Sequence, residues 1–155
     1  IAWSKIEIKL YKIFIYNIIF LIKYMSSNNK LVLTTFIGEV YNFVNLLCTL
    51  LPDSKELEQN KTYFISCKKM NPRAMILSWQ TDIAEHFKKP IQEGDLSFFV
   101  NHDYQNDPYL KDYSSFIVKM FENLKHNINK LKEEDKQTCM TYIQNLSKIS
   151  KLYIV

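Results

Sequence analysis

Two pairs of histidine and carboxylate residues have the types and spacing that could support chemistry. Asp82 and His86 are four positions apart, so on a helix they would share one face. An imidazole beside a carboxylate can act as a general base or bind a metal. His102 and Asp103 are adjacent in a stretch of irregular composition, where functional groups often lie. The simpler interpretations are a helix-surface ion pair for the first pair and, for the second, neighbours that never converge on a ligand.

Recognisable catalytic motifs are absent from the sequence. The chain has no HExxH, no GxSxG and no paired-cysteine ligand set, and its two isolated glycines cannot form a glycine-rich phosphate loop. Cys48, Cys67 and Cys139 stand far apart, which indicates reduced thiols in a cytoplasmic setting rather than a disulfide framework or a zinc site. We therefore expect no catalytic, cofactor-binding or metal-binding residues, and a protein that acts by binding.

A cluster of aromatic residues beside His102 is a different kind of candidate site. Phe98, Phe99, His102 and Tyr104 could form an interaction surface that contacts a protein partner. Core packing is the default expectation for these aromatic side chains, as it is for Trp79. If the structure exposes Phe98 and Phe99 as one patch, that patch counts as an interface.

The distribution of charge argues against a nucleic-acid partner. The formal net charge is +4, but residues 1–24 hold four lysines and one glutamate, a net of +3, which leaves +1 for the rest. The basic residues are 19 lysines and a single arginine, Arg73. Nucleic-acid binders normally carry a clustered basic face with arginines for bidentate contacts. We expect a protein partner or self-association instead.

Helices are the elements that must position these residues. Two glycines and four prolines are too few for the turns of a many-stranded β fold. Apolar residues recur at three- and four-residue steps over residues 31–51, 75–87, 109–131 and 139–153. We expect a turn with a short helical piece over residues 53–60 and, less clearly, a short helix over residues 62–70. Asn71-Pro72 marks the start of the next helix, which is expected to end before Pro90. The sequence predicts an all-α, single-domain bundle of about four to five helices, with an ordered irregular loop near residues 88–108.

The strongest of these signals is the stretch of residues 109–131. Asp107 before Pro108 predicts its N-cap, with proline at the first helical position. Only a short polar connection separates this helix from the last one, which Asp135 or a neighbour would cap, so we expect the two to form an antiparallel hairpin. Gly38 lies inside the helix over residues 31–51 and is expected where another helix approaches closely.

Several interpretations of the N-terminal segment stay open. Its densest apolar run, residues 13–22, is shorter than the roughly 20 residues that span a bilayer. No small-residue cleavage site follows it, as a signal peptide would require. The segment could also be a packed helix, or translated upstream sequence if Met25 is the true start. We therefore separate residues 1–24, as an extension, from a helical domain over residues 25–155. Membrane association would be possible only through residues 10–24.

Residues 87–104, FKKPIQEGDLSFFVNHDY, carry the only family resemblance. A helix bearing Trp79 is followed by a KPI turn and an acidic residue before a Phe-Phe pair. This pattern resembles small uncharacterised helical proteins encoded by large double-stranded DNA viruses, whose AT-rich genomes match the Ile, Lys and Asn content. AT-rich protists match it similarly. The resemblance covers residues 71–105 and implies a viral protein in the host cytoplasm or virion.

The sequence leaves three hypotheses for function. The first is a non-enzymatic helical interaction or structural protein, because strong catalytic motifs are missing and several apolar stripes need partners. The second is a membrane-anchored protein that uses residues 13–22. The third is a small enzyme or metal-binding protein that uses the region of residues 82–103.

Overall fold

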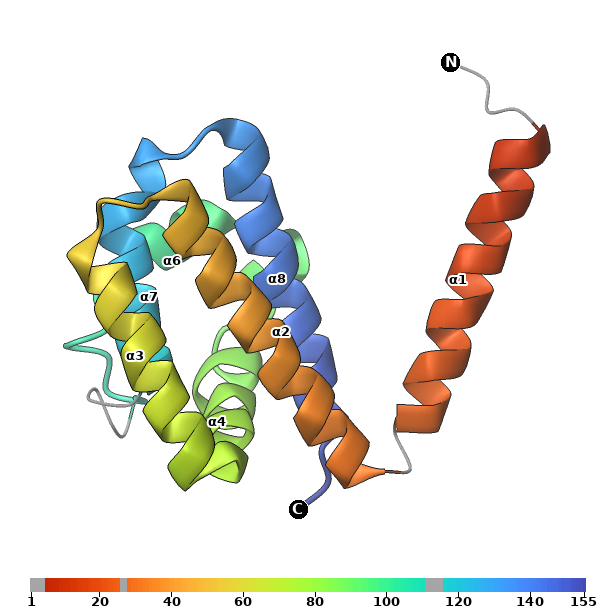
Figure 1. Ribbon diagram of the computed structural model, residues 1–155, viewed down its shortest axis with the longest axis horizontal. Coiled ribbons are helices and arrows are strands. Elements are labelled where there is room, and N and C mark those ends of the chain that lie inside the picture. The colour runs from red at the N-terminus through yellow and green to blue at the C-terminus, as the bar shows by residue number, and fades with distance from the viewer. Residues whose placement is uncertain (1–4, 26–27, 111–115) are drawn as a thin grey trace.

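The computed structural model describes residues 5–25, 28–110 and 116–155 (Figure 1). Within these ranges all regular structure is helical, which confirms the all-α class. The described residues form eight α-helices, one π-helix and one 3-10 helix, so the expected count of four to five helices was too low. The difference arises because stretches predicted as turn, loop or doubtful extension fold into helices of their own.

The central helix is α2, Asn29–Leu50, as the apolar pattern predicted. Its first turn is capped by Asn28, whose side chain accepts a hydrogen bond from the Leu31 amide, and it ends at Leu51, just before Pro52. Its inner face packs against α3 and α8 (Figure 1). The buried side chains on that face are Val32, Phe36, Ile37, Val40, Phe43, Val44, Leu47 and Cys48.

The expectation for Gly38 was wrong. This residue is exposed, and a Cβ atom built on it would meet nothing within 4 Å among the described residues. No helix in the described part of the chain approaches α2 at that point, so Gly38 lies on the solvent side of the helix.

Helix α3, Lys55–Met70, is longer than predicted. We expected a turn with a short helical piece over residues 53–60 and a short helix over residues 62–70. The Ser54 side chain accepts a hydrogen bond from the Leu57 amide, and Glu56 and Glu58 lie in the first turn, where negative charge suits the helix dipole. This cap allows one helix to run through the charged stretch.

The helix predicted to begin at Pro72 does so, but its second half was not predicted. Asn71 caps α4, Pro72–Ser78, by accepting a hydrogen bond from the Ala74 amide. From Trp79 the helix widens into the π-helix η1, Trp79–Glu85. The helix therefore ends earlier than the expected boundary before Pro90.

Trp79 and Gln80 use this widened turn to bind the last helix, α8, Glu133–Lys151. The fully buried Trp79 donates a 3.0 Å hydrogen bond from its indole nitrogen to the Ser147 hydroxyl. The Gln80 amide donates to the carbonyl oxygens of Ser150, at 2.9 Å, and Tyr153, at 3.0 Å. These bonds fix the C-terminal end of α8 on the π-helix. Trp79 is thus a core residue, as expected.

The expected loop near residues 88–108 is ordered and partly helical. It contains α5, Lys88–Glu93, and α6, Leu96–Asn101. Gly94 ends α5 in the left-handed conformation, with φ of 66°, and Asp95 caps α6 by accepting from the Phe98 amide.

The stretch predicted as one helix over residues 109–131 is only partly helical where it is described. Helix α7 covers Phe116–Asn127, and the 3-10 helix η2 covers Ile128–Lys130. Pro108 and Tyr109 form a turn, so the predicted helix start at Pro108 was wrong. Residues 111–115 lie outside the described residues.

The predicted hairpin of the last two helices was also wrong. Helix α7 packs mainly against α3 and α6, whereas α8 packs against α2 and η1 (Figure 1). The N-cap position of α8 is Lys132, which makes no side-chain capping bond among the described residues. Asp135 lies within the first turn instead, where its charge suits the helix dipole.

Helix α1, Lys5–Met25, stands apart from the bundle (Figure 1). Of its described large apolar side chains, eight are between 47% and 73% exposed: Ile6, Leu10, Ile13, Phe14, Tyr16, Ile19, Phe20 and Leu21. In this structure α1 therefore packs little of its surface against the bundle. In the part of the chain that the structure describes, only α2 is long and apolar enough to cross a membrane by length and composition, and Lys12–Leu21 is a shorter apolar stretch.

Candidate functional site

The structure joins His86 and His102 through one carboxylate, Asp107. The Asp107 Oδ2 atom lies 2.8 Å from His86 Nε2 and 2.7 Å from His102 Nε2. The Asp107 side chain is 3% exposed and each histidine side chain 22%. Because an ionised carboxylate only accepts hydrogen bonds, each Nε2 must carry a hydrogen. We call these three residues the two-histidine site.

Three separate elements bring these side chains together. His86 follows the π-helix, and its backbone amide bonds the Ile83 carbonyl. His102 follows α6, and its carbonyl oxygen accepts a 2.8 Å hydrogen bond from Lys125 Nζ of α7. Asp107 lies in the loop after His102, and its second oxygen accepts from the Tyr109 amide at 2.9 Å. The site thus fixes this loop to the end of the π-helix.

Neither sequence-predicted pair forms. Asp82 Oδ2 accepts a hydrogen bond from the Ser78 hydroxyl at 3.1 Å, one turn earlier in the helix. Asp103 accepts from Asn106, through the backbone amide at 3.3 Å and the side chain at 2.7 Å. The true partner of both histidines, Asp107, was predicted as a helix cap. The sequence signal for it was only that Asp107 shares the irregular stretch with His102.

The predicted aromatic surface divides between core and groove. Phe99 is 1% exposed and Tyr104 is fully buried, with the Tyr104 hydroxyl donating to the Phe99 carbonyl at 2.6 Å. These two residues cannot contact a partner. Phe98 and His102 are half-buried and stack on each other, with ring centroids 5.1 Å apart. Burial also raises the pKa of Tyr104 well above its ordinary value.

Opposing effects set the pKa of Asp107. Burial alone would raise it, since water no longer solvates the charged form. The hydrogen bonds from His86, from the Tyr109 amide and from His102 favour the ionised form and outweigh burial, so the pKa of Asp107 lies below its ordinary value. The carboxylate is consequently a stable anionic centre that holds both imidazoles.

An open groove of about 490 Å³ adjoins the two-histidine site. Its walls are largely aromatic, with Phe87 at the base and Phe98 and Tyr109 beside the histidines. Among the described residues that line it there is no serine, threonine or cysteine that could act as a nucleophile. The described part of the chain also contains no group of three side chains placed to hold a metal. The two-histidine site can therefore form hydrogen bonds and hold the loop after α6 in place.

Two of the three cysteines, Cys48 and Cys139, offer no alternative nucleophile. Cys48 and Cys139 are buried, and the Cys48 thiol donates to the Leu57 carbonyl at 3.4 Å. Burial, together with the nearby charge of Asp135, raises the pKa of Cys139 to about 12. Since the thiolate is the reactive form, these two residues behave as small core side chains.

No protein family, curated protein or solved structure was found to match this chain. The resemblance to helical proteins of large DNA viruses thus remains a prediction.

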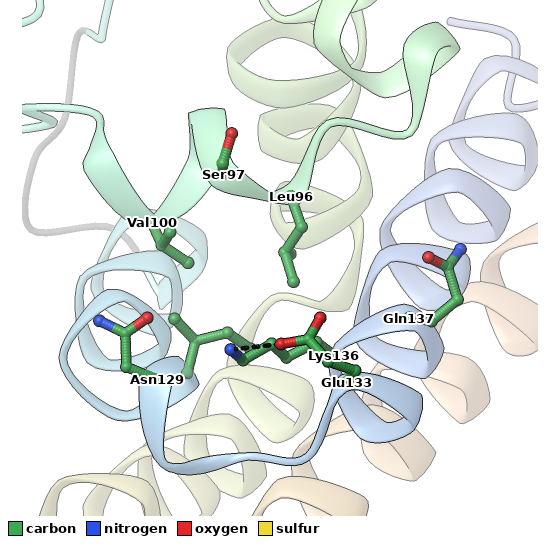
Figure 2. Close-up of a pocket in the computed structure, with 8 residues that line it drawn as sticks. Leu96, Ser97, Val100, Asn129, Glu133, Lys136 and Gln137 are labelled. Atoms are coloured by element: carbon green, nitrogen blue, oxygen red, sulfur yellow. Dashed lines mark hydrogen bonds and ion pairs between the residues drawn. The ribbon is translucent and has the colours of Figure 1, made fainter.

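A second groove, of about 250 Å³, lies between α6 and the start of α8 (Figure 2). Leu96, Val100 and Ile128 form its apolar wall. Its charged groups, Glu133 and Lys136, pair with each other at 3.0 Å. Figure 2 shows the Ser97 hydroxyl directed away from this ion pair. Among the described residues that line this groove, no reactive side chain points into it.

Proposed function

We propose that this protein is a non-enzymatic helical interaction or structural protein, and that α1 is its contact element. The observation that carries the proposal is the exposure of eight large apolar side chains along one helix, each at least 47% exposed. Contiguous exposed apolar surface of this kind marks interaction sites in stable proteins. The exposed apolar residues of the described bundle, such as Ile65 and Met70, are scattered by comparison.

An unsupported α1 is physically unfavourable in water. Helices owe most of their stability in proteins to packing of an apolar face, and α1 packs hardly any of its surface. A partner that covers Phe14, Phe20 and Leu21 would remove this apolar surface from water and stabilise the helix. Association is therefore the activity that best accounts for α1.

The two-histidine site also supports a non-enzymatic role, because its polar groups bind one another. Both Nε2 atoms are engaged with Asp107, and the described groove lining lacks a nucleophile. The site's evident effect is to hold the loop after α6 in place. A small enzyme or metal-binding protein is the alternative, because His86 and His102 do lie together beside a groove. The predicted viral origin and cytoplasmic location belong to the first proposal.

The test compares the full chain with Phe14→Gln/Leu21→Gln, a double substitution on one side of α1. We expect the wild-type chain to self-associate or to bind a fluorescent dye specific for apolar surfaces. The variant should show less self-association and less dye binding. The matched control is Ile65→Gln/Met70→Gln, which removes two apolar residues that are 51% and 84% exposed on α3. If the α1 variant and the control both behave as wild type, α1 is not the contact element.

A further inference from the structure

We propose that α1 binds membranes that contain anionic lipids, with its axis lying in the plane of the membrane surface. This inference rests on the proposed function, in which α1 is the contact element, and adds the chemistry of the partner. The observation behind it is the placement of charge on a helix that is otherwise almost entirely apolar.

The lysines of α1 form a single stripe. At about 100° per residue, Lys5, Lys9, Lys12 and Lys23 fall within roughly 60° of one another around the helix axis. All four side chains are exposed. With Glu7 as the acidic residue of the helix, the net charge of α1 is four minus one, or +3. Such a stripe is complementary to a layer of anionic headgroups.

The side of α1 opposite the lysine stripe carries large apolar residues, and by helical spacing Glu7 falls on the same side. Leu10, Phe14 and Leu21 lie there, at 61%, 61% and 53% exposure. Tyr16 lies within the stripe itself, where its polar hydroxyl and apolar ring suit the boundary between headgroups and hydrocarbon. A helix with this pattern can bury its apolar side in a lipid layer and keep its lysines at the headgroups.

The position of Lys12 argues for a helix in the membrane plane rather than across the membrane. Lys12 is about 5 Å along the axis from the midpoint of α1, so a spanning helix would carry it near the bilayer centre. The uncharged run between Lys12 and Lys23 is only about 15 Å long, roughly half the hydrocarbon thickness. Lying flat places all four lysines at the surface together.

A second copy of the chain fits this surface less well. The apolar residues occupy most of the circumference of α1, with Ile6 and Ile13 flanking the stripe on one side and Ile19 on the other. One packed helix covers only the stripe that faces it, so much of this surface would stay in water. A lipid layer would cover the apolar sides of α1 that a single packed helix leaves in water.

The experiment is flotation of the full chain with vesicles of phosphatidylcholine alone or with roughly 30% phosphatidylserine. We expect binding to the anionic vesicles and its release at about 0.5 M NaCl, where charge is screened. Lys9→Glu/Lys12→Glu should weaken this binding at least about thirtyfold, because each lysine contributes attraction at the surface. The matched control is Lys55→Glu/Lys132→Glu, which makes the same charge change at the starts of α3 and α8 and should bind as wild type.

Each other outcome overturns a defined part of the inference. Equal binding of the wild type and of Lys9→Glu/Lys12→Glu would remove the role of the lysine stripe. Binding that survives high salt and alkaline carbonate would indicate a spanning helix. If no vesicle binds the chain while Phe14→Gln/Leu21→Gln reduces self-association, the lipid partner is wrong and the proposed function stands. If that double variant changes neither behaviour, both proposals fail.

Discussion

Helices α1 and α2 are similar in length and apolar content, but they have opposite surroundings. They contain 21 and 22 residues. The buried side chains of α2 span about 160° of its circumference, and Thr34, Gly38, Asn42 and Thr49 lie on the exposed side. The lysines of α1 span only about 60°, with apolar residues around most of the rest, where Glu7 and Asn17 also fall. The two helices therefore differ in the breadth of the polar face rather than in apolar content.

The largest expected effect tests this contrast with the same substitution in each helix. Phe36→Ala should lower the free energy of unfolding by about 3–5 kcal/mol, because it leaves a cavity in the core. Phe36 is fully buried, with its ring 5.9 Å from that of Trp79. Phe14→Ala should change it by less than about 0.5 kcal/mol, since Phe14 is 61% exposed. Both values come from urea unfolding monitored by circular dichroism.

This comparison fails if the two substitutions cost similar amounts. A large cost at Phe14 would mean that α1 packs on the bundle in solution. A small cost at Phe36 would mean that the core of α2 is loosely packed.

The second prediction concerns how the bundle, unlike α1, is held by specific polar contacts. Asp107→Asn should lower the free energy of unfolding by about 1–3 kcal/mol near neutral pH, because an amide cannot accept from both histidines and the Tyr109 backbone in the same way. Vesicle binding through α1 should not change. Asp53→Asn, at an exposed position outside the site, is the control.

The effect of Asp107→Asn should also depend on pH. The folded-state pKa of Asp107 is lowered, so the unfolded state holds its proton more tightly and the carboxylate stabilises the fold at pH values above its ordinary pKa of about 3.9. This stabilisation is lost as the pH falls through the folded-state pKa. The stability difference between wild type and Asp107→Asn should therefore shrink below about pH 4. A constant difference from pH 7 to pH 3 would contradict this assignment.

Much of the fold could be predicted from local patterns. The apolar repeat located α2 and most of α8, and Asn71 before Pro72 marked the start of α4, because caps and periodicity act over a few residues. The π-helix at Trp79 was missed, since its wider turn depends on tertiary bonds to α8. The pairing of α8 with α2 instead of α7 was missed for the same reason: short connections favour neighbours but do not determine them.

Less of the candidate site than of the fold could be predicted from the sequence. The sequence drew attention to His86 and His102 but gave each the wrong partner, because it could test only residues close in sequence. Asp107 is 21 residues from His86, and they meet only because α6 folds back between them. Phe99 and Tyr104 were offered as surface residues although their aromatic character fitted the core equally well. Burial decides whether an aromatic side chain lies in the core or on the surface, and burial depends on the whole fold.

The smallest expected effects come from the two glycines, which the fold uses in opposite ways. Gly38→Ala should raise the free energy of unfolding by about 0.5–1 kcal/mol, since the site is helical and open and alanine restricts the unfolded chain. Gly94→Ala should lower it by about 1–2 kcal/mol, because φ there is +66° and the new Cβ would lie 3.4 Å from Gln144 Nε2. Urea unfolding of both variants shows whether each substitution raises or lowers the free energy of unfolding. A destabilising Gly38→Ala would mean that something covers the outer face of α2, and the contrast between a solvated outer face of α2 and an unpacked α1 would then no longer hold.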